Sequence, residues 1–135
     1  MRWKVGRSVF LLGLLVAAVV ALSSPSAAGA NHRVFVSNCG KTAFRPHTIV
    51  VFCGDAGVIV DRIHWRHWGF RAARGRGTVH TKTCNPDCAS GGVRTDRVKV
   101  RLSHRHMCRN GKRYFLRINV RYPAGNVLHH SLGCP

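Results

Sequence analysis

Six cysteines constrain the fold of this chain more than any other feature of its sequence. All of them lie between Cys39 and Cys134. An even number of cysteines in a short exported chain predicts three disulfides, because thiols are oxidised outside the cytoplasm and small cores need covalent support. Zinc is the alternative, since Cys84 and Cys88 have a spacing also seen in zinc sites. No second C-x-x-C or H-x-x-x-H lies at a finger-like distance, so we predict disulfides and no metal or other cofactor.

Residues 1–30 have the features of an export signal. Arg2, Lys4 and Arg7 precede an unbroken run of fourteen apolar or small residues at 9–22, and a small-x-small pattern ends at Ala30. A transmembrane helix needs about twenty apolar residues, so the run is short for one. We expect cleavage before Asn31 and no transmembrane segment afterwards; an uncleaved anchor is the alternative. The sequence thus predicts a signal peptide helix at 1–30 and a single secreted, extracellular domain at 31–135.

Period-two patterns and β-branched residues dominate the predicted domain, and no stretch of ten or more residues shows a helical stripe. In R-V-K-V-R-L-S, the side chains of Val98, Val100 and Leu102 should point inward while the basic residues between them point outward. The pattern predicts a mainly β fold, a single small antiparallel β-sandwich-like domain with disulfides. We expect strands over 33–37, 48–53, 57–65, 77–82, 97–103 and 113–122.

Clusters of Gly, Pro, Asn and Asp predict turns between these strands, at 53–57, 74–77, 85–87, 90–92 and 110–111. Asn110-Gly111 is a strong hairpin signal, so the strands on either side of it should be antiparallel neighbours. The R-G-R-G sequence at 74–77 has two interpretations. It is either a plain turn or a cradle in which glycine N–H groups and arginines approach a phosphate.

Charge is the feature that most restricts the partners of the domain. Removing the three basic residues of the signal from 22 leaves 19 against four aspartates, a formal charge of +15 with histidines neutral. Such a charge attracts polyanions, so we expect an anionic envelope polymer or another polyanion as partner, and nucleic acid only non-specifically. The alternative is that the charge serves solubility alone, and we expect a monomer in either case. The candidate anion-binding residues are Arg74, Arg76, Arg97, Lys99, Arg101, Arg117 and Arg121.

Trp65 and Trp68 also have two interpretations. They are either core or sheet-covering aromatics, or an exposed platform on which bases or sugar rings stack. Simple alternation along the strand at 57–65 predicts one side with Ile59, Asp61, Ile63 and Trp65, and the other with Val60, Arg62 and His64.

Nine histidines raise the question of metal binding or catalysis. The pairs 64 and 67, 104 and 106, and 129 and 130 are close in sequence, but nothing in their spacing forces convergence on one ion. The chain has no glutamate, no G-x-S-x-G and few carboxylates. We therefore expect a non-enzymatic protein. The second hypothesis is a protein-interaction or inhibitor module that uses loops 43–46 and 87–94, and the third is a histidine-dependent ribonuclease-like enzyme.

A series of short motifs resembles small secreted actinobacterial proteins of unknown function. The motifs are C-G at 39–40, R-P at 45–46, C-G-D-x-G at 53–57, I-x-W-x-x-W at 63–68, C-N-P-x-C-A-x-G at 84–91 and V-x-V-x-L at 98–102. Each motif is weak alone, but their order is fairly specific and covers 39–122. The resemblance implies an exported, single-domain, largely β protein with no assigned activity, and it supplies no catalytic residue.

The resemblance also implies a pairing of the cysteines. Cys39, Cys53, Cys84 and Cys88 match the regular cysteines of that pattern, whereas Cys108 and Cys134 are additions in this chain, as are the many histidines and arginines. Of the fifteen pairings that six cysteines allow, the resemblance supports Cys39 with Cys53, Cys84 with Cys88, and Cys108 with Cys134.

Overall fold

The computed structural model describes residues 33–135, so the predicted signal peptide and its cleavage point lie outside the described residues. The described residues belong to one compact unit. Among them, no helix is long and apolar enough to cross a membrane. The strands are β1 (Val34–Asn38), β2 (Lys41–Ala43), β3 (Ile49–Val50), β4 (Val58–Trp68), β5 (Ala73–Lys82), β6 (Val93–Met107), β7 (Arg113–Arg121) and β8 (Val127–Ser131).

All eight strands belong to one sheet, in the order β2-β1-β7-β6-β5-β4-β3, and β8 also pairs with β7. The predicted mainly β fold is confirmed. The hairpin predicted at Asn110-Gly111 is present, because β6 and β7 pair in antiparallel register on either side of it. One pairing departs from the antiparallel expectation: β1 lies parallel to β7, with Val34 opposite Arg113.

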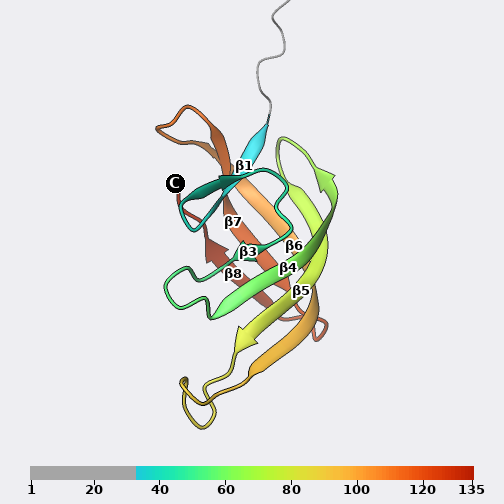
Figure 1. The fold of residues 1–135 in the computed structure, drawn as a ribbon. Coiled ribbons are helices and arrows are strands. Elements are labelled where there is room, and N and C mark those ends of the chain that lie inside the picture. Colours follow the sequence, from blue (N-terminus) through green and yellow to red (C-terminus); the bar gives the residue numbers. More distant parts are fainter. Residues whose placement is uncertain (1–32) are drawn as a thin grey trace, which may run out of the picture. The chain divides into compact units, whose positions relative to one another are not determined.

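The sheet curls until its two ends meet across the core (Figure 1). The indole N–H of Trp68 on β4 donates to the carbonyl of Val34 on β1 at 2.9 Å, although three strands separate β4 from β1 in the sheet order. The Asn38 side chain at the end of β1 also bonds the backbone of Thr48 and Val50, both at 3.0 Å. The two layers of the predicted sandwich-like domain are therefore two parts of one curled sheet.

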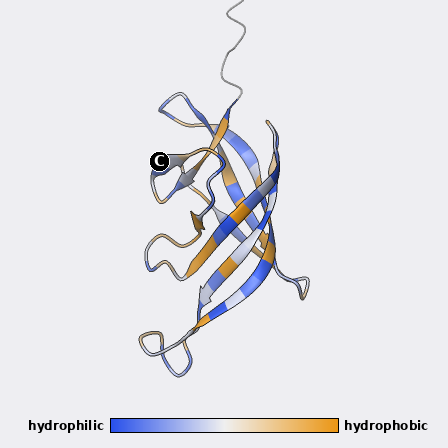
Figure 2. Ribbon diagram, turned by 45° about the vertical axis from the view of Figure 1, so that its right-hand side comes forward, coloured by the Kyte–Doolittle hydropathy of each residue, from blue (hydrophilic) through white to orange (hydrophobic). Residues whose placement is uncertain are grey.

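Alternation along β6 and β7 separates a hydrophobic core from a polar outer surface, as the colours of the strands in Figure 2 show. Val98, Val100 and Leu102 are buried as predicted, and Phe115 at the centre of the core is fully buried. The hydroxyl of Tyr114, also fully buried, lies 2.7 Å from the hydroxyl of Thr42 and accepts from the Asn110 amide at 2.8 Å. The core thus leaves the outward side of these strands free for basic residues.

The predicted alternation along β4 is wrong beyond Asp61. Val58, Val60 and Ile63 are buried and Trp65 packs against the same core, so the inward positions change from even to odd numbers. The cause is a β-bulge at Arg62, where φ is 48° and the register shifts. A bulge adds one residue to one strand and so reverses which side the following side chains face. A second register shift between Trp65 and His67 reverses the phase again and turns Trp68 inward.

The turn predicted at R-G-R-G is wrong, because Arg74, Gly75, Arg76 and Gly77 lie inside β5. The bulged strand β4 comes so close that a Cβ atom at Gly75 would lie 2.8 Å from the His64 carbonyl oxygen and 3.0 Å from the Trp65 ring. A Cβ atom at Gly77 would lie 2.8 Å from the Asp61 carbonyl oxygen. Glycine is therefore required here for close approach of two strands and not for a turn.

Other boundaries also differ from the predicted ones. The strand expected over 48–53 is reduced to Ile49–Val50, whereas β5 and β6 are longer than predicted. The short strands β2 and β8 were not predicted, since neither has a run of β-branched residues long enough to stand out.

The three disulfides are those that the resemblance implies. Cys39–Cys53 joins the β1–β2 turn to the segment after β3, and Cys84–Cys88 lies within the β5–β6 loop. Cys108–Cys134 joins the end of β6 to the segment after β8. All six cysteines of the chain are paired in these bonds. The three bonds fix the loops and the chain end around the sheet and leave the outer side of β5, β6 and β7 uncovered by them.

Candidate anion-binding surface

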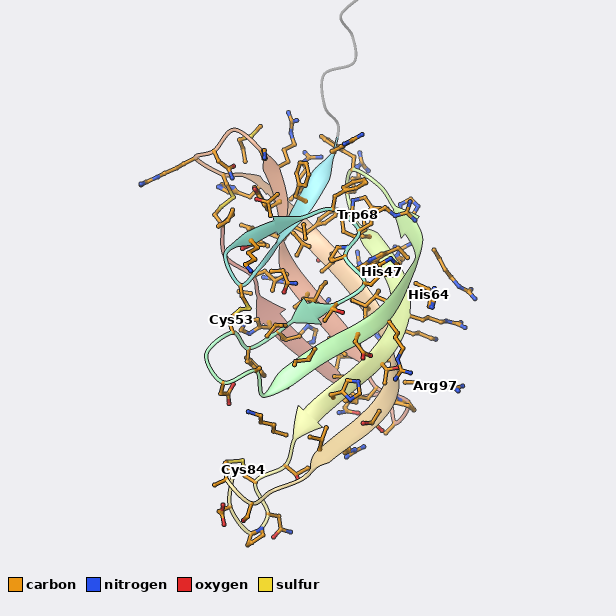
Figure 3. All side chains as sticks on the ribbon, viewed as in Figure 1. His47, Cys53, His64, Trp68, Cys84 and Arg97 are labelled. Atoms are coloured by element: carbon orange, nitrogen blue, oxygen red, sulfur yellow. A yellow bond between two sulfur atoms is a disulfide. The ribbon has the colours of Figure 1, made fainter. Side chains whose placement is uncertain are left out.

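All seven candidate anion-binding residues are exposed on the outer face of β5, β6 and β7. On β6, Arg97, Lys99 and Arg101 alternate with the buried core residues, so they share one side of the strand. Figure 3 shows Arg97 and His64 of β4 projecting from the sheet away from the core. We call this side of the four strands the outer face.

The register of the sheet brings basic residues into two rows that cross the strands. The first row contains His64, Arg76, Lys99 and Arg121, one from each of β4, β5, β6 and β7. The second row contains His67, Arg74, Arg101, Asn119 and His129, and it continues onto β8. Directly opposite residues have Cβ atoms about 4.5–5.5 Å apart, so each row is a closely spaced line of donors and cations.

The two remaining candidates flank these rows. Arg97 lies opposite Thr78, next to the first row. Arg117 lies between Ser103 and Ser131, next to the second row. The structure therefore brings all seven residues to one face. Sequence reasoning missed His64, His67 and His129, because their place in the rows depends on cross-strand register, which has no local sequence signal.

Carboxylates do not compensate this charge. The ion pairs among residues 33–135 are Asp61 with Arg62 at 3.5 Å, Asp61 with His80 at 3.2 Å, and Asp96 with Arg94 at 2.8 Å. None of them involves a candidate residue. Cross-strand pairs of like charge such as Lys99 and Arg121 destabilise a sheet, so folding does not account for these rows.

The other two aspartates are used within loops. Asp55 accepts the backbone N–H of Gly57 at 2.9 Å. Asp87 accepts the Ser90 hydroxyl and the backbone N–H groups of Ser90 and Ala89 at 2.8 and 2.9 Å. These hydrogen bonds, that of the Ser90 hydroxyl first, hold the pKa of Asp87 below its ordinary value of 3.8.

An open groove of about 1060 Å³ runs along the first row. It is lined by residues of all four strands, among them Arg62, His64, Arg76, Arg97, Lys99 and Arg121. One carboxylate, that of Asp96, also lines the groove, and it is paired with Arg94. Arginine offers a planar fork of donors that binds phosphate or carboxylate in a bidentate way. The groove can therefore hold a chain of anionic groups along its length.

The two tryptophans support the interpretation as sheet-covering aromatics. Trp65 and Trp68 are half-buried, pack against the core and contact each other at 4.7 Å between ring centroids. Both indole N–H groups are bonded, that of Trp65 to the Pro46 carbonyl at 2.8 Å and that of Trp68 to Val34. They do not stand out from the surface as a stacking platform would.

The histidines are dispersed. Within residues 33–135, no three His, Cys, Asp or Glu side chains gather where they could hold a metal ion. The neighbours His129 and His130 have different partners: His129 lies 2.9 Å from the Asn119 amide oxygen, and the His130 ring packs edge-on against Phe52 at 4.8 Å.

One histidine lies between a carboxylate and a hydroxyl. His80 Nε2 is 3.2 Å from Asp61 Oδ2, and His80 Nδ1 is 3.2 Å from Thr95 Oγ1. An aspartate, a histidine and a hydroxyl in this order are the groups of a catalytic triad, in which the aspartate orients the imidazole. The three residues lie on the neighbouring strands β4, β5 and β6, where His80 is directly opposite both Ile59 and Thr95.

The two loops of the interaction-module hypothesis lie at opposite ends of the sheet. Loop 43–46 is fixed to the C-terminal part of β4, since the Arg45 side chain donates to the Trp65 carbonyl at 3.3 Å. Residues 87–92 of the second loop belong to the β5–β6 connection at the other end of β5, and its last two residues begin β6 (Figure 1). They do not form one common surface.

Comparison of the chain with protein-family models, with curated proteins and with solved structures found no match. The resemblance to small secreted actinobacterial proteins therefore stays a prediction.

Proposed function

We propose that this domain is a secreted, non-enzymatic protein that binds anionic polymers of the cell envelope or the extracellular medium through its outer face. The observation that carries the proposal is the pair of cross-strand rows, in which basic residues lie opposite one another without carboxylate partners. Such an arrangement opposes folding, and a bound polyanion would offset it by neutralising the repulsion. Three disulfides are compatible with an oxidising, extracellular location.

The groove along the first row supports a polymer over a single small anion as ligand. Its basic lining residues come from four strands, so successive anionic groups of one chain would each meet a cation. The affinity would come from phosphate or carboxylate contacts and from released counterions, with little selectivity for sequence.

A salt titration with a short DNA duplex as a defined polyanion tests the proposal. The sample is residues 31–135, which contain the complete core and all three disulfides. We expect the logarithm of the binding constant to fall linearly with the logarithm of salt concentration, with a slope of about −0.9 per phosphate contacted. The variant Lys99→Gln/Arg121→Gln should bind less tightly. The magnitude of its slope should be smaller by an amount that corresponds to about two phosphate contacts.

The matched control removes the same charge outside the outer face. Lys41 on β2 and Arg109 in the β6–β7 turn are both exposed, so Lys41→Gln/Arg109→Gln tests net charge alone. Equal losses in the two double variants would show that total charge, and not the outer face, determines binding.

A further inference from the structure

A second surface lies at the end of the sheet formed by the β4–β5 and β6–β7 hairpins, with the start of β1 between them (Figure 1). Exposed apolar side chains and cations alternate there. We call it the aromatic end and define it by Phe44, Phe70, Met107, Arg33, Arg105, Lys112 and Arg113.

The exposed large apolar side chains are concentrated at this end of the sheet. Among the described residues, the large hydrophobic side chains that are exposed are Phe44 (44%), Phe70 (38%), Met107 (46%) and Val93 (63%). Three of these four belong to the aromatic end, and Val93 lies at the opposite end of β6. The fold thus places bulky apolar groups in water mainly where two hairpins and β1 meet.

Cations lie directly on the exposed rings. The Arg105 guanidinium is 3.5 Å from the centroid of the Phe70 ring, and the Arg113 guanidinium is 5.6 Å from it. The Arg33 guanidinium is 5.5 Å from the Phe44 ring. A guanidinium that contacts a ring through its face keeps N–H donors in its plane. Each ring therefore carries a group that can bind a phosphate at the same place.

Shared neighbours make the aromatic end continuous. Arg113 contacts Phe70 and lies opposite both Met107 on β6 and Val34 on β1. Phe44 packs against Phe35 at 5.9 Å, and the Lys112 ammonium lies 5.6 Å from the Phe35 ring. The apolar and the basic groups thus belong to one surface.

We infer that the aromatic end docks on the surface of an anionic phospholipid membrane. Side chains that combine an apolar group with an adjacent cation suit the boundary between acyl chains and headgroups, because the ring is buried while the cation meets phosphate. Stacking of nucleic-acid bases is less suited, since Arg105 already covers the Phe70 ring. A second copy of the chain would meet its own cations. The inference concerns a surface and a ligand distinct from those of the proposed function.

Binding to vesicles tests this inference. The probe is phosphatidylcholine vesicles with about 30 mol% phosphatidylglycerol at about 150 mM salt, compared with phosphatidylcholine alone. We expect residues 31–135 to bind only the anionic vesicles. The variant Phe70→Ser/Met107→Ser keeps the net charge and should bind them at least about tenfold less tightly, while its affinity for duplex DNA stays unchanged.

Two controls separate the surfaces. Val93→Ser removes an even more exposed apolar side chain, at the opposite end of β6 from Met107, and should leave vesicle binding unchanged. Lys99→Gln/Arg121→Gln should weaken DNA binding more than vesicle binding. No binding by the parent protein, or equal vesicle binding by all variants, would overturn the inference and leave the polyanion proposal standing.

A measurement on the unsubstituted protein guards against misfolding of the variant. The Trp68 ring lies 5.5 Å from the Phe44 ring, so brominated acyl chains should quench tryptophan fluorescence in the vesicle-bound state. Bound protein whose fluorescence is not quenched would contradict docking through this end.

Discussion

Two glycines of β5 show how one residue type determines the geometry of the outer face. Gly75 and Gly77 allow the bulged strand β4 to lie against β5. That contact positions His64 and His67 opposite Arg76 and Arg74, so the rows extend over four strands or more.

Gly75→Ala should therefore destabilise the domain. The added Cβ atom would meet the His64 carbonyl oxygen at 2.8 Å, and overpacking of this kind costs about 1–3 kcal/mol in the free energy of unfolding. Gly54→Ala is the control, since its Cβ atom would have nothing within 4 Å, and its effect should stay within about 0.5 kcal/mol. Urea denaturation of both variants measures the difference, and equal stabilities would refute the close-approach explanation.

Asp87 gives a pH-dependent prediction for the β5–β6 loop. Its pKa is lowered by hydrogen bonds from Ser90 and Ala89, so the loop is stabilised by the ionised form above pH 3.8, and this contribution is lost as the pH falls below that value. Hydrogen exchange of the Ser90 and Ala89 amides should show loss of protection only below pH 3.8. The step should be absent in Asp87→Asn, and a midpoint above 3.8 would contradict the assignment.

Among the elements, β6 was the easiest to predict and β4 the hardest. Val98, Val100 and Leu102 alternate with basic residues, and this local pattern alone determines which side each residue faces. In β4 the same rule failed, because the left-handed conformation of Arg62 reverses the phase and no local signal marks an arginine for that conformation.

The candidate site was predictable in its residues but not in its arrangement. Alternation identified the five exposed cations of β6 and β7, whereas Arg74 and Arg76 were candidates only as part of a predicted turn. The opposition of Lys99 to both Arg76 and Arg121 depends on the register of three strands. The parallel pairing of β1 with β7 is similarly non-local. The glycines at 75 and 77 suggested a turn because glycine is frequent in turns, whereas here a neighbouring strand requires them.

The opposed cations of β6 and β7 lead to a prediction about stability. Lys99→Gln/Arg121→Gln should raise the free energy of unfolding by a few tenths to about 1 kcal/mol at low salt, because it removes a repulsive cross-strand pair. Urea is the suitable denaturant since it does not screen charge, and the gain should shrink at about 1 M salt.

Arg94→Gln is a control for that experiment. It removes one exposed cation where the double variant removes two, but it breaks the 2.8 Å ion pair with Asp96 and should not stabilise the domain. A loss of stability in Lys99→Gln/Arg121→Gln would mean that these two residues hold the sheet together, which would weaken the functional interpretation of the rows.

For the whole molecule, the three disulfides differ in how much they contribute to the stability of the fold. Cys108–Cys134 joins residues 26 apart and Cys84–Cys88 residues 4 apart. The chain entropy of the unfolded state predicts that the free energy of unfolding falls by about 3.5 kcal/mol in Cys108→Ser/Cys134→Ser and by about 2 kcal/mol in Cys84→Ser/Cys88→Ser. Thermal unfolding of both variants checks this order, and a larger effect of the short loop would contradict the entropic account.

The polyanion proposal is most directly tested by sedimentation of oxidised residues 31–135 with cell envelopes of the producing organism across a salt series. We predict that bound protein is released between about 50 and about 200 mM salt, and that Lys99→Gln/Arg121→Gln is released at lower salt than Lys41→Gln/Arg109→Gln. Binding that does not change over this range would contradict electrostatic attraction through the outer face and would indicate a specific receptor instead.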